Sequence, residues 1–174
     1  AAVLVLILVQ RGMHRRADRG LGLFIIGQLL WGLNVFGFRG SDDLLWALRF
    51  ERFTPTAVSL AVVSFFYFSR LITGLSPARW MRILITAHLL ASIASIPTPL
   101  IVESVKVADY GNTVVWGVGL YSWILPIYLM MGMSVAYLYH GYRIAPSYTE
   151  KNRLLLLIIA ASVSVLGGML DVAP

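Results

Sequence analysis

Long apolar stretches separated by short polar connections dominate this chain. The longest extends from Thr113 to Tyr139 and contains no Asp, Glu, Lys or Arg. An α-helix rises about 1.5 Å per residue and needs roughly 20 apolar residues to cross the bilayer hydrocarbon, so this stretch is long enough. A buried helix of a small soluble protein would show a polar face, and none is visible here. The pattern therefore predicts a membrane span.

The same pattern predicts five further spans. Together the six lie at residues 1–10, 21–38, 44–70, 80–102, 113–140 and 154–170, the first of them truncated. Gly40, Ser41 and two Asp provide the chemistry of a helix start before residue 44. The chain lacks an initiator Met, and both ends break off in or beside apolar sequence. The predicted fold class is all-α: a polytopic membrane helix bundle, one domain over residues 1–174, with six visible spans of seven.

Composition supports lipid as the solvent. Hydrophobic residues make up 59% of the 174 residues and charged residues 13%, whereas about a quarter of an average globular protein is charged. The absence of cysteine excludes disulfides and thiolate metal sites. The net charge of +6 comes from Lys and Arg in short connections, which points to membrane topology and not to nucleic acid.

The positions of Lys and Arg predict an orientation, because cytoplasmic connections are enriched in them. Ten of the 14 lie in the first, third and fifth connections, and four lie in the second and fourth. The N-terminus is then expected outside an inner (plasma) membrane, and a seventh helix would bring the C-terminus of the full-length protein to the cytoplasm. The residues expected to determine this topology are Arg11, Arg15, Arg16, Arg19, Arg79, Arg82, Arg143, Lys151 and Arg153.

The chain contains no sequence motif of an enzyme. Walker-type, GxGxxG, GxSxG, HExxH and paired-cysteine motifs are all absent from the sequence. We therefore expect this fragment to be non-catalytic, with no catalytic residue, metal or cofactor. His14 lies in an arginine-rich connection and is interpreted as a neighbour of lipid headgroups.

His88 is the titratable residue placed well inside a predicted span. Intramembrane ionisable groups are costly in lipid, which makes His88 a candidate for sensing protons or binding a ligand. The alternative is a neutral histidine that hydrogen-bonds to an adjacent helix. Its position near Ser92 and beside Ala87 and Ala91 favours this packing interpretation.

Aromatic and basic residues gather at the predicted outer ends of two spans. Trp46 and Arg49 precede the apolar part of the third span at helical spacing, whereas Tyr110 precedes the fifth span and Trp116 lies in its first turn. Arg49 is either an interfacial anchor that snorkels to the headgroups or part of an outward-opening pocket for an anionic or aromatic ligand. Trp116 belongs either to an aromatic belt or to the same ligand site. The candidate signal-binding residues are Trp46, Arg49, His88, Tyr110 and Trp116.

Four segments in this order resemble a known family. They are the basic connection before LLWGLNVFGF, then LLWALRFERF leading into FFYF, then YGNTVVWGVGLYSWILPIYLMM with a YR exit, and finally LLLLIIAASVSVLGGMLDVAP. This order resembles the N-terminal seven-helix input region of bacterial membrane histidine kinases, a region also found ahead of diguanylate cyclase domains. The matched positions are Trp46, Arg49, Tyr110, Gly111 and Asp171.

The resemblance implies a transmembrane sensory input module. It would relay an unknown small-molecule or membrane stimulus to a C-terminal cytoplasmic output domain missing from this chain, either a histidine kinase or a diguanylate cyclase. The expected partners are the lipid bilayer and, by analogy with two-component sensors, a second copy in the full-length protein. The alternative is a fragment of a small membrane transporter or permease, for which Pro97 and Pro126 are the supporting features.

Overall fold

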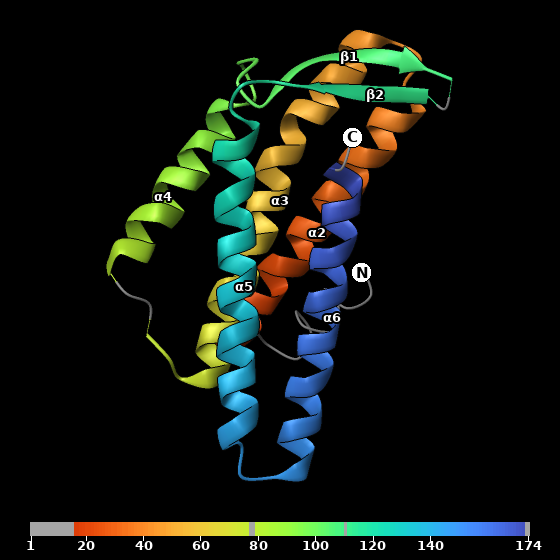
Figure 1. Ribbon diagram of the computed structural model, residues 1–174. Coiled ribbons are helices and arrows are strands. Elements are labelled where there is room, and N and C mark those ends of the chain that lie inside the picture. Colours follow the sequence, from red (N-terminus) through yellow and green to blue (C-terminus); the bar gives the residue numbers. More distant parts are fainter. Residues whose placement is uncertain (1–15, 77–78, 110, 173–174) are drawn as a thin grey trace.

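The computed structural model describes residues 16–76, 79–109 and 111–172, with side chains from residue 17 to residue 163 within these ranges. The described residues form five helices and one small hairpin (Figure 1). The bounds are α2 Arg16–Gly40, α3 Leu44–Thr73, α4 Arg79–Ala94, β1 Val102–Ala108, β2 Gly111–Trp116, α5 Leu120–Ile144 and α6 Tyr148–Val172. The predicted helical architecture is confirmed, and the hairpin corrects the all-α assignment.

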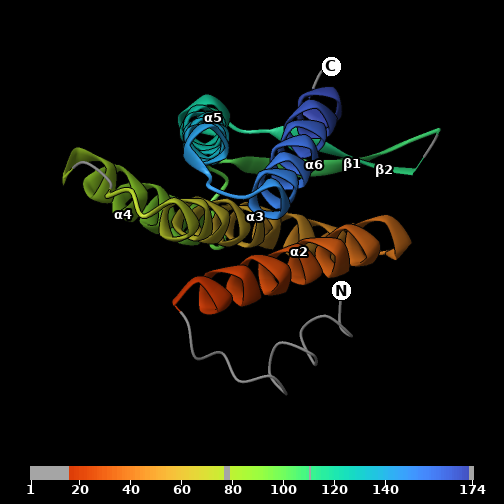
Figure 2. The same cartoon turned by 90° about the horizontal axis from the view of Figure 1, so that it is seen from below.

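Helix α3 lies at the centre of the bundle. It packs most extensively against α2 and also against α5 and α4, whereas α6 packs mainly against α5. Viewed along the bundle, α2 lies on one side of α3, and α5 and α6 lie on the other (Figure 2). Successive helices alternate in direction, so the connections from α3 to α4 and from α5 to α6 share the lower end of Figure 1. The hairpin closes the upper end.

The start of α3 follows from its flanking residues. The Asp43 side chain accepts a hydrogen bond from the Leu45 backbone N–H at 2.8 Å and caps the first turn. Gly74, with φ of 70°, ends the helix in the left-handed region, which glycine adopts without steric cost. The predicted start at residue 44 is confirmed.

Small residues let α2 and α3 approach closely. A Cβ atom placed on Gly27 would lie 2.7 Å from the backbone nitrogen of Ala61, so the helices meet backbone to backbone there. One on Gly37 would lie 2.7 Å from the Phe50 ring. These two glycines fix how α2 lies along α3.

Two predicted spans are wrong at one end each. The span 80–102 was predicted to end too late, and the span 113–140 was predicted to begin too early. Helix α4 has 16 residues and ends at Ala94, which gives a length of roughly 24 Å, shorter than the ~30 Å hydrocarbon core. Pro97 and Pro99 follow, and proline removes a backbone donor and clashes with the preceding turn. Residues 113–116 belong to β2 and not to a helix. The predicted fifth span therefore begins at Leu120.

The hairpin pairs β1 with β2 in antiparallel register. Val105 lies opposite Val114, Lys106 opposite Thr113 and Val107 opposite Asn112, with an irregularity between Val102 and Ser104. β-Branched residues favour this pleated structure. At its base the backbone N–H of Gly117 donates to the Ile101 carbonyl at 2.8 Å, and that of Gly119 to the Leu100 carbonyl at 2.7 Å. The hairpin is thus joined to the start of α5 by a hydrogen-bonded connection.

The number of membrane spans is also corrected. Within the described residues, three helices are long and apolar enough to cross a membrane: Ala17–Gly40, Leu44–Thr73 and Leu120–Ile144. The predicted span 1–10 lies outside the described residues, and α4 is too short. The predicted span 154–170 lies within α6, which is not among the three and whose side chains are described only to residue 163. The three candidate spans indicate a multi-pass membrane protein.

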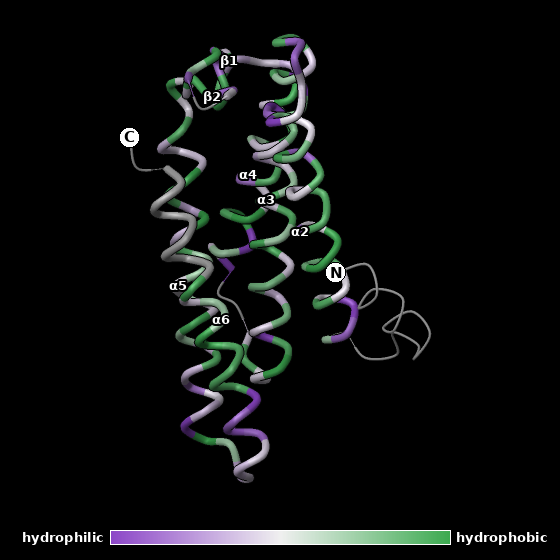
Figure 3. Tube along the Cα trace, turned by 90° about the vertical axis from the view of Figure 1, so that its right-hand side faces the viewer, coloured by the Kyte–Doolittle hydropathy of each residue, from purple (hydrophilic) through white to green (hydrophobic). Residues whose placement is uncertain are grey.

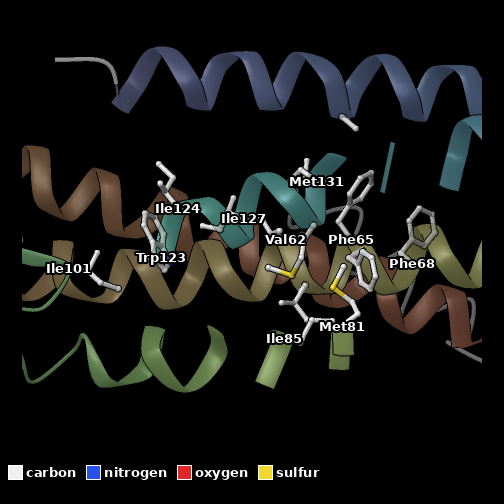
Figure 4. Close-up of a cluster of buried hydrophobic side chains, with 14 of the residues drawn as sticks. Val62, Phe65, Phe68, Met81, Ile85, Ile101, Trp123, Ile124, Ile127 and Met131 are labelled. Atoms are coloured by element: carbon white, nitrogen blue, oxygen red, sulfur yellow. The ribbon is translucent and has the colours of Figure 1, made fainter. Parts of the chain in front are cut away.

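The apolar core lies between α3, α4 and α5. Figure 4 shows Val62, Phe65 and Phe68 of α3 beside Met81 and Ile85 of α4, with Trp123 to Met131 of α5 closing the cluster. Large apolar side chains also face outward: Phe36 is 79% exposed and Ile83 72% exposed. Hydrophobic residues follow the length of the helices, and hydrophilic ones gather at the lower turn between α5 and α6 (Figure 3). Outward apolar surface of this extent is typical of lipid contact.

The described topology-determining residues lie toward one end of the bundle. Arg16 and Arg19 lie at the start of α2, Arg79 and Arg82 at the start of α4, Arg143 in the last turn of α5, and Lys151 and Arg153 at the start of α6. Arg11 and Arg15 lie outside the described residues. Arg39, Arg49, Arg52 and Lys106 lie toward the hairpin end. Which end faces the cytoplasm stays a prediction.

Candidate functional site

A buried polar cluster joins α3, α4 and α5. It consists of Ser59, His88, Ser92 and Trp123, all at most 6% exposed. Ser59 Oγ lies 2.9 Å from His88 Nε2 and 2.7 Å from Ser92 Oγ. The indole N–H of Trp123 donates to the same Ser59 oxygen at 3.0 Å. One serine of the central helix therefore bonds to both α4 and α5.

Counting protons in the polar cluster assigns the tautomer of His88. Ser92 donates its single hydroxyl proton to the His88 carbonyl at 2.8 Å, so the Ser59–Ser92 bond must use the proton of Ser59. Ser59 Oγ then accepts from His88 Nε2–H as well as from Trp123, which fills both lone pairs. His88 carries its proton on Nε2, and its buried Nδ1 is an acceptor without a hydrogen-bond partner among the described residues.

The end of α4 is held on α3 by the same hydroxyl-rich face. Thr56 Oγ1 of α3 donates to the Ser92 carbonyl at 2.9 Å. Ser95 Oγ lies 2.6 Å from the same carbonyl and 3.4 Å from the Arg52 carbonyl of α3. The carbonyl of Ser92 lies in the last turn of α4, where carbonyl groups have no partner within the helix. The hydroxyl groups supply the missing donors and so stabilise the end of this short helix. His88 thus lies in a structural junction, which is the geometry that its packing interpretation requires.

A serine and a histidine in hydrogen-bond contact could in principle support nucleophilic catalysis. Ser59 is fully buried, however, and its oxygen already accepts two hydrogen bonds. A nucleophile needs a free approach for substrate and a base that accepts its proton, and here the histidine nitrogen is the donor. The geometry of the polar cluster is therefore that of a link between helices.

A second site, the upper hollow, lies between α2 and α3 near the hairpin end. Its volume is about 220 Å³, and its lining residues are Asn34, Trp46, Arg49, Phe50 and Phe53. The Arg49 guanidinium carbon lies 4.8 Å from the centre of the Trp46 ring, a cation–π contact. Trp46 is 52% exposed, whereas Asn34 is only 8% exposed. The upper hollow combines one cation, one buried amide and three aromatic rings.

A third feature is the seat of the hairpin on the ends of α2 and α3. The Asn112 side-chain amide donates to the carbonyl groups of Phe38 and Ser41, both at 2.8 Å. In return, Arg39 donates to the Asn112 carbonyl at 3.0 Å. Arg52 donates from Nε to the Val102 carbonyl at 3.3 Å and from Nη2 to the Glu103 carbonyl at 3.2 Å. Both strands are thus bonded to the helices below them.

The structure brings together only part of the predicted signal site. Trp46 and Arg49 share the upper hollow. His88 lies apart from them in the polar cluster, and Trp116 ends β2 opposite Val102, partly buried against the core. Tyr110 lies outside the described residues. The candidates therefore divide among three places instead of forming one site.

Several residues that the geometry makes important were missed in the sequence. Ser59 lies in the apolar part of α3, where its three-residue spacing from Thr56 could have indicated a polar face toward another helix. Asn112 follows the Tyr-Gly pair, a turn signal that would have predicted a hairpin had TVVW been taken as a strand. Among the described residues no three His, Asp or Glu side chains gather in a way that could hold a metal ion.

No protein-family model, curated protein or solved structure matches this chain.

Proposed function

We propose that this chain is the transmembrane sensory input module of a signal-transduction protein. It relays a stimulus from the hairpin end of the bundle to a cytoplasmic output domain that follows in the full-length protein, a histidine kinase or a diguanylate cyclase. The single observation that carries this proposal is the double attachment of the hairpin. It continues directly into α5, and it is hydrogen-bonded through Asn112 to the end of α2.

This attachment supports a relay because the two connections belong to different parts of the bundle. A displacement of the hairpin carries the start of α5 with it, and the Asn112 bonds resist it unless the end of α2 moves as well. Helix α5 packs along α3 and leads into α6 at the lower end. A stimulus that binds one position of the hairpin more tightly than another would shift the populations of two helix arrangements.

The lower ends of α3 and α5 offer a place to test the relay. A Cβ atom on Gly141 would lie 3.6 Å from the Cβ of Thr73, within the spacing of about 3.5–4.5 Å that a disulfide requires. The chain contains no cysteine, so Thr73→Cys with Gly141→Cys would supply its only thiols. Oxidation would fix α3 to α5 at that point.

The experiment uses the full-length protein in membrane vesicles and needs no known stimulus. Asn112→Ala frees the hairpin, and output is measured as autophosphorylation or as cyclic dinucleotide formation. We expect Asn112→Ala to change basal output, the oxidised Thr73→Cys/Gly141→Cys pair to abolish that change, and reduction to restore it. The two single-cysteine variants serve as controls under the same oxidant. An output that responds equally with and without the cross-link contradicts the relay.

The experiment also separates the proposal from its rival. A transporter would move solute across the vesicle membrane, and its cross-linked form would lose uptake whatever domain follows. Unchanged output in every variant, together with loss of uptake on oxidation, would therefore replace the sensor by the transporter.

A further inference from the structure

The upper hollow is lined by an exposed arginine that the protein leaves without a hydrogen-bond or ion-pair partner among the described residues. Within the described residues, Arg49 makes no hydrogen bond or ion pair, and its contact is the stacking of the guanidinium on Trp46. Its neighbour Arg52 is used differently, because both of its bonds go to the hairpin backbone. Arg49 therefore keeps its planar set of donors for a ligand.

The upper hollow also holds an amide whose polar atoms are open to it. Asn34 is 8% exposed, and in the part of the chain that the structure describes its side chain makes no hydrogen bond. Its amide atoms keep contact with solvent, because among the described residues His88 Nδ1 is the one fully buried side-chain nitrogen or oxygen without a partner. A ligand in the hollow can therefore take the place of solvent at this amide. Asn34 and Arg49 come from different helices, α2 and α3, and line the same space.

The remaining walls of the upper hollow are apolar. Phe50 and Phe53 lie one turn apart on α3, and Phe53 is 40% exposed. One cation and one amide donor match a singly charged, planar acceptor such as a carboxylate, which accepts paired N–H bonds from arginine. A phosphate dianion would be left with part of its charge uncompensated. The aromatic rings suit an apolar group attached to that carboxylate.

The size and depth of the upper hollow limit the ligand. Its volume of about 220 Å³ is below the ~300–1,000 Å³ of sites for drug-sized molecules, and it is open on one side, so it has room for a small acid or for the head of a longer one. Asn34 and Arg49 lie five to six residues from the ends of their helices, a depth of roughly 8 Å. In a membrane this is the interfacial layer, which both a dissolved acid and a fatty acid can reach.

We propose that the upper hollow binds the carboxylate of an apolar acid, with Arg49 and Asn34 as its donors and Phe50 and Phe53 against its apolar part. The role of this site rests on the proposed function. In a sensory input module, occupancy of the upper hollow is the stimulus. The ligand bridges α2 and α3 directly beside the seat of the hairpin.

The test measures binding to the whole chain in phosphatidylcholine nanodiscs by calorimetry. Benzoate represents a water-soluble acid and decanoate a membrane-dissolved one, with benzyl alcohol and decanol as uncharged counterparts. We expect at least one of the two acids to bind and its alcohol to bind at least about tenfold more weakly. Binding of benzoate alone identifies a soluble source, and binding of decanoate alone identifies the bilayer as the source.

Substitutions connect the binding to the upper hollow. Arg49→Gln should weaken binding at least about tenfold, and Asn34→Leu should weaken it several-fold, because each removes donors to the carboxylate. Lys106→Gln removes one exposed positive charge at the same end of the molecule and should leave binding unchanged. Circular dichroism and gel filtration check that each variant is folded.

Binding of neither acid, or acid binding that Arg49→Gln leaves intact in a folded protein, overturns the proposal. Its failure is distinguishable from failure of the sensor role, because binding is measured without any output domain. Acid binding with no effect on output would contradict the claim that occupancy of the upper hollow is the stimulus. A cross-link-sensitive output without acid binding would contradict the site alone.

Discussion

The side-chain nitrogen of Asn112 lies 2.8 Å from the carbonyl oxygen of Phe38, a residue 74 positions earlier in the chain. Phe38 is in the last turn of α2, where helix carbonyls have no partner within the helix. A residue of the hairpin therefore completes the end of a helix that is remote in sequence. This contact explains why the hairpin and α2 are expected to move together.

Asn112→Ala should destabilise the protein by about 1–3 kcal/mol, because it leaves the carbonyl groups of Phe38 and Ser41 without their donor. Unfolding in detergent by a denaturant series, followed by circular dichroism, measures the change. Lys106→Ala, on the exposed edge of the same hairpin, is the control and should be close to neutral. Equal stability of the two variants would show that the Asn112 bonds do not hold the hairpin.

Ser59→Ala should cost about 1–3 kcal/mol, since it removes the acceptor of both Trp123 and His88 at once. Ser134 is the matched control, because it is equally buried but bonds only to the Met130 carbonyl of its own helix. Ser134→Ala should be much milder. The same unfolding series checks both variants, and a cost for Ser134→Ala as large as that for Ser59→Ala would contradict the linking role of Ser59.

The ring of His88 should be neutral with its proton on Nε2, as the hydrogen bonds of Ser59 and Ser92 require. Nitrogen-15 NMR of histidine-labelled protein at neutral pH distinguishes the two tautomers. His14 and His140 are assigned by substitution to Gln, which leaves His88 as the remaining signal. A signal from the tautomer protonated on Nδ1 would mean that the Ser59 proton points at His88 and that the proton count is wrong.

Gly27→Ala should destabilise the packing of α2 on α3 by about 1–3 kcal/mol, because the new methyl group meets the Ala61 backbone at 2.7 Å. Gly32, on the same helix, has nothing within 4 Å of such a methyl group, so Gly32→Ala should be neutral or slightly stabilising. Thermal unfolding of the two variants in one detergent compares them directly. Equal midpoints would argue against the close contact.

The helices could be predicted from the sequence because apolar length and charge spacing are local properties. The start of α3 was predicted correctly from the Ser41 to Asp43 turn, and Asp43 is its cap. The basic connections were recognised for the same reason, since each group of Lys and Arg interrupts an apolar stretch. These signals need no knowledge of which helix packs on which.

The hairpin was missed because hydropathy does not distinguish a strand from a helix. TVVW and the helix after it form one apolar stretch, and only the β-branched residues and the glycines at 117 and 119 mark the boundary. The same limit applies to α4, whose apolar stretch continues past the end of the helix into two prolines. Counting apolar residues therefore overestimated both spans.

The sites were only partly predictable, because they depend on contacts between helices. Trp46 and Arg49 lie close together on one helix, and their pairing was visible at helical spacing. Asn34 comes from α2 and Ser59 from the middle of α3, and nothing local indicates that one lines the upper hollow and the other meets His88. Such partners become visible only once the helices are packed.

We expect the hairpin and the α5–α6 connection to lie on opposite sides of a membrane, and the sensor role depends on this. The absence of native cysteine allows Lys106→Cys on β1 and Ser147→Cys between α5 and α6 to be labelled singly in intact cells with a membrane-impermeant maleimide. We predict that Lys106→Cys is labelled from outside, whereas Ser147→Cys reacts only after the membrane is permeabilised. Labelling of both positions in intact cells, or of Ser147→Cys alone, would contradict the account.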